Sequence, residues 1–227
     1  MTPDPLLESL RHRLIVSVQA DAGNPMDNPA ILSAMAQAVE QGGAAAIRAG
    51  GPANIRAIRQ KVQVPIFGIY KREYPDSPVY ITPTLDEARQ VVEAGCDVLA
   101  FDATRQSRPG GQTLEDFFQQ LKAEFALPLM ADVSTLDEGL QAESLGANLV
   151  ATTLAGYTPY SRHLDGPDFL LVEDLVARLR VPLIVEGRIR DPEDARRALD
   201  LGAFAVVVGS MITRPGTITA HFVAGIT

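Results

Sequence analysis

Eight short apolar runs recur along the chain, and segments with helical spacing separate each run from the next. The runs are continuous rather than alternating, which is typical of strands buried on both faces of a parallel sheet. They cover residues 14–18, 44–47, 64–70, 97–101, 127–131, 147–151, 181–185 and 203–208. Parallel neighbours need crossover connections, usually helices, so this alternation predicts an α/β fold.

The ends of the intervening helices are marked by capping chemistry. TLDE occurs at Thr84–Glu87 and again at Thr135–Glu138, and each copy is a capping box, in which threonine and glutamate satisfy free N–H groups at the start of a helix. DPED at Asp191–Asp194 places a proline at the first helical position. Glycines suited to a left-handed helix stop follow four predicted helices: Gly43, Gly95, Gly146 and Gly202.

Eight strand–helix units in 227 residues predict a single domain, residues 1–227, with the fold of a (β/α)8 TIM barrel. A doubly wound open sheet is the alternative, but it usually carries a glycine-rich first turn, and the sequence has no GxGxxG. Residues 1–13 are expected to form a short helix that closes the barrel floor. The long connections at 71–83, 102–112 and 153–167 follow strands, so we expect them at the C-terminal face, where barrel active sites lie.

The composition excludes several kinds of partner. The formal charge of -8 argues against a nucleic-acid binder, which needs a basic face. Cys96 is the single cysteine, so no internal disulfide can form, and we expect it to be a buried small residue. No apolar run approaches the about 20 residues of a membrane span, and residues 1–14 lack the pattern of a signal peptide. We therefore expect a cytoplasmic protein without a membrane partner.

Polar or glycine positions stand at the C-terminal ends of the predicted strands: Gln19, Arg48, Lys71, Asp102, Asp132, Thr152 with Thr153, Glu186, and Gly209 with Ser210. Lys71 needs a particular explanation, because it follows VPIFGIY, a run suited to a buried strand. A single strand-end lysine is often only a solvated loop residue. In a barrel, however, all eight strand ends converge on one mouth, so a ring of charged side chains indicates a site.

Glycines follow the last two predicted strands, in VEGRI (185–189) and VVGSMITRP (207–215). These positions form a phosphate-binding cup in many barrels, because glycine lets backbone N–H groups approach the oxygens. Gly187 and Gly209 would provide those amides, and Ser210 and Arg214 could add donors. A second and weaker candidate for an anion site is the turn RAGGPAN (48–54).

The sequence predicts no metal site. His12, His163 and His221 lie away from the strand ends, so the predicted rim has no histidine pair for a transition metal. Asp102 with Asp132 is the alternative, because two carboxylates could hold a hard cation. The chain has no GxSxG elbow and no plausible Ser–His–Asp or Cys–His set for nucleophilic catalysis.

The rim segments together resemble one known family. They are LIVSVQ, AAAIRAGG, IFGIYKREYPDSPVYITPT, GCDVLAFDAT, LMADVST, ATTLAGYT, LIVEGRI and VVVGSMITRP. From about residue 14 to residue 215, the chain resembles the N-acetylmannosamine-6-phosphate 2-epimerases of bacterial sialic acid catabolism, whose motifs match the segments around Lys71 and Glu186. The chain has Leu154-Ala155 where the family often has Met-Ser, and loop 159–167 matches no familiar segment.

The resemblance implies a TIM barrel of the ribulose-phosphate-binding type that interconverts N-acetylmannosamine 6-phosphate and N-acetylglucosamine 6-phosphate. Its small-molecule partner would be a sugar phosphate. Epimerisation at C2 needs a base, an acid and enolate stabilisation, but no cofactor. Lys71 and Glu186 match the family's catalytic pair. Gln19, Arg48 and Asp132 would bind sugar hydroxyls and the N-acetyl group, and Gly187, Gly209, Ser210 and Arg214 would hold the phosphate.

Two other functions stay open. A Schiff-base aldolase or lyase on the same barrel would also use a strand-end lysine, and a sugar-phosphate-sensing barrel would keep the site without turnover. A base must lose its proton, so we expect partial burial and the neighbouring Arg48 and Arg72 to lower the pKa of Lys71. The sequence leaves open whether the barrel is a homodimer and what loop 153–167 contacts.

Overall fold

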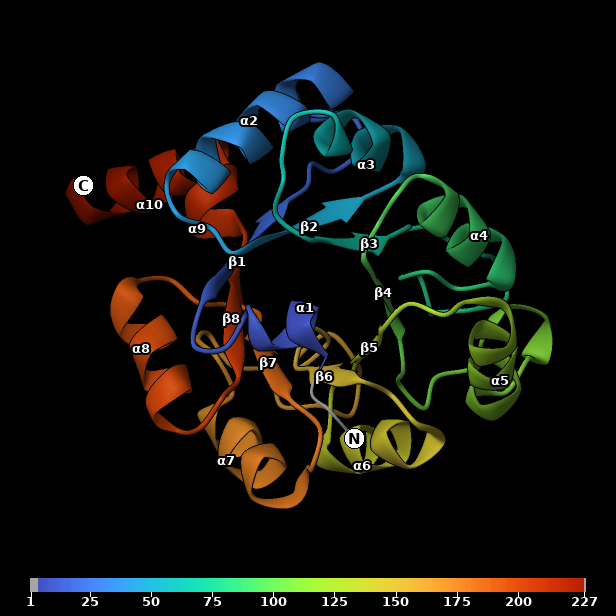
Figure 1. The fold of residues 1–227 in the computed structure, drawn as a ribbon. Helices are drawn as coiled ribbons and strands as arrows, with labels where there is room; N and C mark the ends of the chain where they lie inside the picture. The colour runs from blue at the N-terminus through green and yellow to red at the C-terminus, as the bar shows by residue number, and fades with distance from the viewer. Residues whose placement is uncertain (1–3, 227) are drawn as a thin grey trace.

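In a computed structural model that describes residues 4–226, eight parallel strands form a closed barrel (Figure 1). Each strand pairs with its successor, and β8 pairs with β1 to close the ring. The strands are β1 (Leu14–Val18), β2 (Ala46–Gly50), β3 (Ile66–Ile69), β4 (Val98–Asp102), β5 (Leu129–Asp132), β6 (Leu149–Ala151), β7 (Leu183–Glu186) and β8 (Ala205–Val208). The prediction of a (β/α)8 TIM barrel is confirmed.

Helices alternate with the strands and surround the barrel (Figure 1). They are α1 (Pro5–Glu8), α2 (Pro29–Gln41), α3 (Pro52–Arg59), α4 (Leu85–Glu93), α5 (Leu114–Glu124), α6 (Leu136–Leu145), α7 (Phe169–Arg178), α8 (Pro192–Asp200), α9 (Ser210–Thr213) and α10 (Pro215–Ile226), with a short 3-10 helix, η1 (Pro109–Gly111). Among the described residues, none of these helices is long and apolar enough to span a bilayer.

The predicted helix boundaries are present. Thr84 and Thr135 cap α4 and α6, and the glutamates of the two capping boxes reach back to the cap residues. Asp191 caps α8 and accepts a 2.8 Å hydrogen bond from the Asp194 N–H. The four glycines predicted as helix stops, Gly43, Gly95, Gly146 and Gly202, all have φ between 95 and 104°.

Several strands begin later than the apolar runs that predicted them, whereas most strand ends lie within one residue of the prediction. Three of the late starts follow from Pro65, Pro128 and Pro182, because proline has no N–H group to donate within a sheet. Each proline carbonyl still accepts from the neighbouring strand, as in the 2.9 Å bond from the Ile47 N–H to the Pro65 oxygen. The strand ends position the site, so these late starts do not affect it.

The barrel interior is a packed core. Phe67, Met130 and Ile184 belong to a buried cluster that fills it, as expected for this fold. Leu7 and Leu10 join the same cluster, which confirms, for its described part, that the N-terminal segment closes the barrel floor. A second apolar cluster lies between the strands and the outer helices. The polar strand ends therefore face one open end of the barrel.

Glycine at position 68 lets α4 pack closely on β3. A Cβ atom at Gly68 would lie 2.5 Å from Val91 Cγ1 and 2.7 Å from Cys96 Cβ, so a larger residue would push the helix away. Cys96 itself is half-buried against the outer cluster. Burial raises the pKa of its thiol to about 12, which agrees with a packing role for this residue.

Candidate active site

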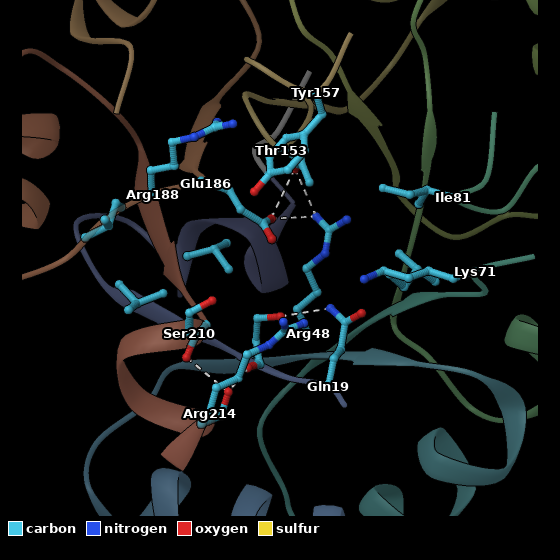
Figure 2. A pocket seen from close by; sticks show the side chains of 18 of the residues that line it. Gln19, Arg48, Lys71, Ile81, Thr153, Tyr157, Glu186, Arg188, Ser210 and Arg214 are labelled. Atoms are coloured by element: carbon cyan, nitrogen blue, oxygen red, sulfur yellow. Dashed lines mark hydrogen bonds and ion pairs between the residues drawn. The ribbon is translucent and has the colours of Figure 1, made fainter. Parts of the chain in front are cut away.

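A cavity of about 330 Å³ opens at the C-terminal end of the barrel, where the strand ends converge (Figure 2). A cavity of this size suits a small ligand. Eight of the predicted site residues line it: Gln19, Arg48, Lys71, Glu186, Gly187, Gly209, Ser210 and Arg214. The ninth, Asp132, is completely buried and forms hydrogen bonds with Arg48.

Arg48 forms the centre of a buried network below the cavity. Its guanidinium donates from Nη2 to Asp132 Oδ2 at 2.6 Å and from Nη1 to Asp132 Oδ1 at 3.0 Å. Nη1 also donates to Glu186 Oε2 at 2.7 Å. Thr153 Oγ1 donates to Asp132 Oδ1 at 2.6 Å and lies 3.1 Å from Glu186 Oε2. Arg48 lies within β2, Asp132 and Glu186 are the last residues of β5 and β7, and Thr153 closely follows β6, so the barrel itself fixes their arrangement.

The network determines the charge states of its members. Burial alone would lower the pKa of Arg48, but Asp132 and Glu186 more than offset that effect and raise it. Burial raises the pKa of Glu186, and the Asp132 carboxylate adds to the rise, whereas Arg48, Thr153 and Lys71 oppose it. Glu186 therefore holds a proton more readily than a solvated glutamate would.

Asp132 and Arg48 are the most deeply buried of the residues predicted to bind the sugar. Asp132 has no exposed surface, and both of its carboxylate oxygens accept hydrogen bonds from Arg48. Only 1% of Arg48 is exposed, and its two terminal nitrogens are engaged by Asp132, Thr153 and Glu186. Their direct binding of the sugar stays a prediction, and their hydrogen bonds show that they orient one another and Glu186.

A hairpin at the end of β3 positions Lys71. Lys71 forms an antiparallel bridge with Ile81, and the Arg72 N–H donates to the Tyr80 carbonyl at 2.9 Å. The segment 70–82 therefore doubles back and returns to β4, where the Asp102 N–H donates to the Ile81 carbonyl at 2.9 Å. Lys71 therefore follows an apolar strand at the point where the chain turns back over the barrel mouth.

Arg108 locks the base of this hairpin. Its buried guanidinium donates to the carbonyls of Asp102 at 2.6 Å, Thr82 at 3.1 Å and Pro83 at 2.9 Å. It also stacks over the ring of Phe117, 3.9 Å from the centroid. Thr82 has a φ of 46°, a conformation that is uncommon for a non-glycine residue. The contacts from Arg108 hold that conformation and thereby fix the hairpin that carries Lys71.

Lys71 is an exposed residue whose ammonium points into the cavity (Figure 2). Desolvation by the cavity walls is the largest influence and lowers its pKa, and the positive charges of Arg48 and Arg214 lower it further. Asp21 and Glu186 act in the opposite direction. The expected direction is confirmed. Arg72, the other cation expected to act on Lys71, forms an ion pair with the buried Glu87.

The predicted phosphate cup lies at the β7 and β8 side of the cavity (Figure 2). Gly187 has a φ of 108°, which favours glycine, and Gly209 packs so closely that a Cβ there would lie 3.2 Å from Ser17 Cβ. Ser210 begins α9. At the rim, Arg214 donates to Asp21 at 2.9 and 3.2 Å. The structure thus brings all four residues predicted to bind phosphate to one wall.

Several lining residues had no role in the sequence prediction. Thr153 was recognised as a strand end but was not linked to the charged pair. Arg188 has a φ of 57°, donates to the Ala155 and Gly156 carbonyls at 2.5 and 3.1 Å, and stacks over the Tyr157 ring at 4.3 Å. The EGR motif could have pointed to Arg188. No local pattern could have placed Tyr157, because it lies on a loop whose path depends on these contacts.

The alternative cation site between β4 and β5 has little free coordination capacity. Asp102 and Asp132 are adjacent in the sheet register, but Arg48 already occupies both oxygens of Asp132. Asp102 Oδ1 accepts hydrogen bonds from the N–H and hydroxyl of Thr104 at 2.9 and 2.6 Å. Across residues 4–226, no group of three or more His, Cys, Asp or Glu side chains is arranged to hold a metal ion.

Comparison with known proteins places this cavity within a family. The model of the N-acetylmannosamine-6-phosphate epimerase family matches residues 32–227. A relative from Caldanaerobacter subterraneus subsp. tengcongensis that bears the name N-acetylmannosamine-6-phosphate 2-epimerase is 48% identical over 219 residues, covering 96% of this chain and 92% of its own. A relative of the same name from Clostridium perfringens strain SM101 is 47% identical over 217 residues, covering 96% and 98%.

A solved structure agrees with these sequence matches. The structure of the N-acetylmannosamine-6-phosphate 2-epimerase from Clostridium perfringens superposes with a TM-score of 0.94 at 45% identity and covers 99% of this chain and 97% of its own. The likeness therefore includes the whole barrel and all the strand ends that form the cavity. The chain belongs to the N-acetylmannosamine-6-phosphate epimerase family.

Proposed function

We propose that this protein is an isomerase that interconverts N-acetylmannosamine 6-phosphate and N-acetylglucosamine 6-phosphate by moving the proton on C2. Besides the family membership, one structural observation supports the proposal. Lys71, with a lowered pKa, and Glu186, with a raised pKa, enter the same cavity from opposite sides, with Arg48 between them (Figure 2). A base and an acid with pKa values shifted toward neutrality are what a two-direction proton transfer requires.

The chemistry follows from the position of the proton. In the open sugar, C2 lies next to the C1 aldehyde, so loss of the C2 proton leaves an enolate whose charge rests on the C1 oxygen. A neutral lysine can take that proton and become an ammonium ion. A proton returned to the opposite face of C2 restores the aldehyde in the other epimer. No electrons leave or enter the sugar, so the reaction is balanced without a redox cofactor.

Arg48 would support both proton-handling groups. Its positive charge lowers the pKa of Lys71 and, through the 2.7 Å hydrogen bond, orients Glu186. Asp132 and Thr153 hold Arg48 in that orientation. We assign Arg48 and Asp132 as positioning residues and Gln19 as a donor to the sugar. The Gln19 amide lies on the cavity wall, with its Nε2 2.8 Å from Ser17 Oγ.

The 6-phosphate would occupy the wall formed by the ends of β7 and β8. Backbone N–H groups at Gly187 and Gly209, the Ser210 hydroxyl and the Arg214 guanidinium are the donors assigned to it. Arg214 is half-buried at the rim, where it pairs with the exposed Asp21. An exposed ion pair contributes little to stability, so Arg214 can exchange Asp21 for a phosphate at small cost.

A Schiff-base lyase is the second candidate, because a lysine with a lowered pKa is also suited to attack a carbonyl. Borohydride separates the two reactions, since it reduces an imine between Lys71 and the sugar to a stable amine. An adduct of protein plus sugar in the mass spectrum would favour the lyase. The absence of an adduct, together with turnover, would favour the epimerase.

The direct test is incubation of the purified chain with N-acetylmannosamine 6-phosphate and a coupled assay for N-acetylglucosamine 6-phosphate. We expect turnover in both directions, ending at one equilibrium ratio from either sugar. A chain that bound the sugar phosphate without converting it would be a sensor and would contradict the proposal. A cytoplasmic location and a homodimer are parts of the proposal that this assay does not address.

A further inference from the structure

Glu87, the glutamate of the first TLDE capping box, is completely buried, although it stands in the first turn of the outer helix α4. Its two carboxylate oxygens have different partners. Oε2 accepts hydrogen bonds from the N–H of Thr84 at 3.2 Å and from the Thr84 hydroxyl, at the capped end of α4. Oε1 accepts from Arg72 Nη1 at 3.1 Å and from the Tyr74 hydroxyl at 3.0 Å. Both of these donors belong to the hairpin that carries Lys71.

A helix cap alone does not explain why Glu87 is buried. In a capping box the glutamate reaches back to the N–H of the cap residue, and a solvated side chain can make that contact. Burying a carboxylate is costly unless hydrogen bonds and an opposite charge compensate for it. Here Arg72 supplies the charge, and its guanidinium lies 5.5 Å from the centroid of the Tyr74 ring. The hairpin, rather than the cap, therefore accounts for the buried position of Glu87.

The second TLDE box repeats this division between a cap and a loop. Glu138 is 2% exposed, and its Oε2 accepts from the N–H of Thr135 at 3.0 Å, as a cap requires. Its Oε1 accepts from the Arg105 N–H at 2.9 Å and from the Tyr160 hydroxyl at 2.7 Å, and both of these donors lie on loops that follow strands. The glutamate of each box therefore fastens loops at the barrel mouth to an outer helix.

The position of the Arg72 side chain sets the direction of Lys71. The backbone there is extended, because Lys71 forms an antiparallel bridge with Ile81. Successive side chains of an extended segment point to opposite faces. Arg72 extends to Glu87 on α4, and Lys71 extends into the cavity (Figure 2). An Arg72 side chain held on α4 therefore keeps its neighbour directed inward.

Other contacts hold the hairpin at its two ends. Arg108 fixes the base, as described above. At the tip, the Ser77 hydroxyl donates to the Ser107 carbonyl at 2.7 Å, and this contact is exposed to solvent. Between these two ends, Glu87 binds the side chain of the residue next to Lys71. Its contact is buried and carries a full charge on each side, so it is the contact that controls the middle of the hairpin.

We propose that Glu87 is a positioning residue, which holds Lys71 in place for the transfer of the C2 proton. Its Oε1 fixes Arg72 and Tyr74 on α4, and the hairpin thereby presents Lys71 to the cavity. Glu87 is not one of the residues that line the cavity, so it acts through the hairpin and not on the sugar. This inference rests on the proposed function, because it gives Glu87 a part in the same reaction.

The kinetics of Glu87→Ala test the proposal. Misplacing a reacting group by about 1 Å can cost about 100-fold in rate, so we expect kcat to fall by about 10-fold or more. KM should stay near the wild-type value, because the residues assigned to the sugar and the phosphate lie on other strands. Glu87→Gln should recover part of the lost kcat, since its amide oxygen can still accept from Arg72.

Thr84→Ala is the matched control. It removes the hydroxyl that caps α4 and contacts Oε2, but it leaves both donors to Oε1 of Glu87 in place. Loss of a helix cap lowers stability, so we expect a lower melting temperature with the wild-type kcat. The comparison separates the hold on the hairpin from the general stability of α4.

The titration of Lys71 gives a readout that needs no turnover. Desolvation in the cavity lowers the pKa of Lys71, and a side chain released to solvent should return to about 10.4. Competitive labelling with acetic anhydride at several pH values, read by peptide mass spectrometry, measures this pKa. It should rise in Glu87→Ala, whereas loss of the Glu87 charge alone would lower it. Both variants keep the charged groups around Lys71, which are Asp21, Arg48, Arg214 and Glu186.

Arg72→Met combined with Tyr74→Phe produces the same loss from the hairpin side. It removes both donors to Oε1 and keeps the cap, so it decides the question if Glu87→Ala fails to fold, as judged by circular dichroism. An unchanged kcat or an unchanged pKa of Lys71 in a folded variant would overturn the positioning role, as would an equal loss of kcat in Thr84→Ala. If the wild-type chain showed no turnover, the proposed function would fail, and the pKa of Lys71 would decide the positioning role by itself.

Discussion

Arg48 donates a 2.7 Å hydrogen bond to Glu186 at the mouth of the barrel, where Arg48 is 1% and Glu186 13% exposed at the side chain. The same guanidinium holds Asp132 at 2.6 Å. One cation therefore lies between two carboxylates that would otherwise face each other in a poorly solvated place. The stability of the barrel mouth and the charge state of Glu186 both depend on it.

Replacing Arg48 should destabilise the fold. Arg48→Met leaves Asp132 and Glu186 buried without their cation, and breaking a buried ion pair from one side costs about 3–5 kcal/mol. We expect a loss of this size in the free energy of unfolding, measured by urea titration. Arg48→Met with Asp132→Leu should recover much of it without recovering activity, since the double variant no longer buries an unpaired carboxylate at position 132. Arg48→Met as stable as the wild type would show that the network does not support the fold.

Removing the side chain of Lys71 should stop turnover without affecting the fold. Lys71 is an exposed residue on a hairpin, so Lys71→Ala removes no core packing. Loss of a general base costs about 10²–10⁴-fold in rate or more. We expect kcat to fall by at least this factor in the coupled assay, with an unchanged melting temperature. Lys61→Ala, at an exposed lysine far from the cavity, is the control and should keep wild-type kcat. A near-normal kcat in Lys71→Ala would contradict the assignment of Lys71 as a proton-transfer residue.

Substitutions of Arg214 and of its ion-pair partner Asp21 test the proposed phosphate site. A hydrogen bond to a charged group is worth about 1.5–3 kcal/mol, so Arg214→Ala should raise KM for the phosphorylated sugar by about 10-fold or more. Asp21→Asn should lower KM or leave it unchanged, because it releases Arg214 from competition with the carboxylate. The unphosphorylated sugar should be a poor substrate and insensitive to Arg214→Ala. Equal KM values for the two sugars in the wild type would argue against a phosphate site.

The buried carboxyl group of Asp102 should make the free energy of unfolding depend on pH. Burial raises its pKa from 3.8 to about 6, and its Oδ2 atom is buried without a hydrogen-bond partner. Because the folded-state pKa is the higher one, the contribution of Asp102 to stability is fully present below about pH 4 and is lost as the pH rises through about 6. A shift of about two units corresponds to roughly 3 kcal/mol.

Asp102→Asn removes this titration. We expect the difference in unfolding free energy between the variant and the wild type to shift in favour of the variant by about that amount between pH 4 and pH 6. Urea unfolding at several pH values measures it. A difference that did not change with pH would mean that folding does not raise the pKa of Asp102.

The sequence predicted the site as far as the barrel geometry determines it. Gln19, Lys71, Glu186 and Arg214 could be brought together in advance, because all strands of a parallel barrel end at one face. The burial of Asp132 could not be predicted, since it depends on the direction in which the Arg48 side chain points. The clamp by Arg108 was equally hidden, because its acceptors are backbone carbonyls of loops whose conformation it helps to fix.

Solvent deuterium at C2 tests the central claim most directly. If Lys71 and Glu186 move the C2 proton, turnover in D2O must place deuterium at C2 of the product, because a lysine ammonium exchanges its protons quickly with solvent. NMR of each sugar incubated separately with the enzyme measures this. Glu186→Gln should lose epimerisation but keep slow C2 exchange from only one sugar, the one whose proton faces Lys71. Exchange from both sugars in that variant would contradict only the assignment of one residue to each face. Product formed in D2O with C2 still fully protonated would contradict the proton-transfer mechanism itself.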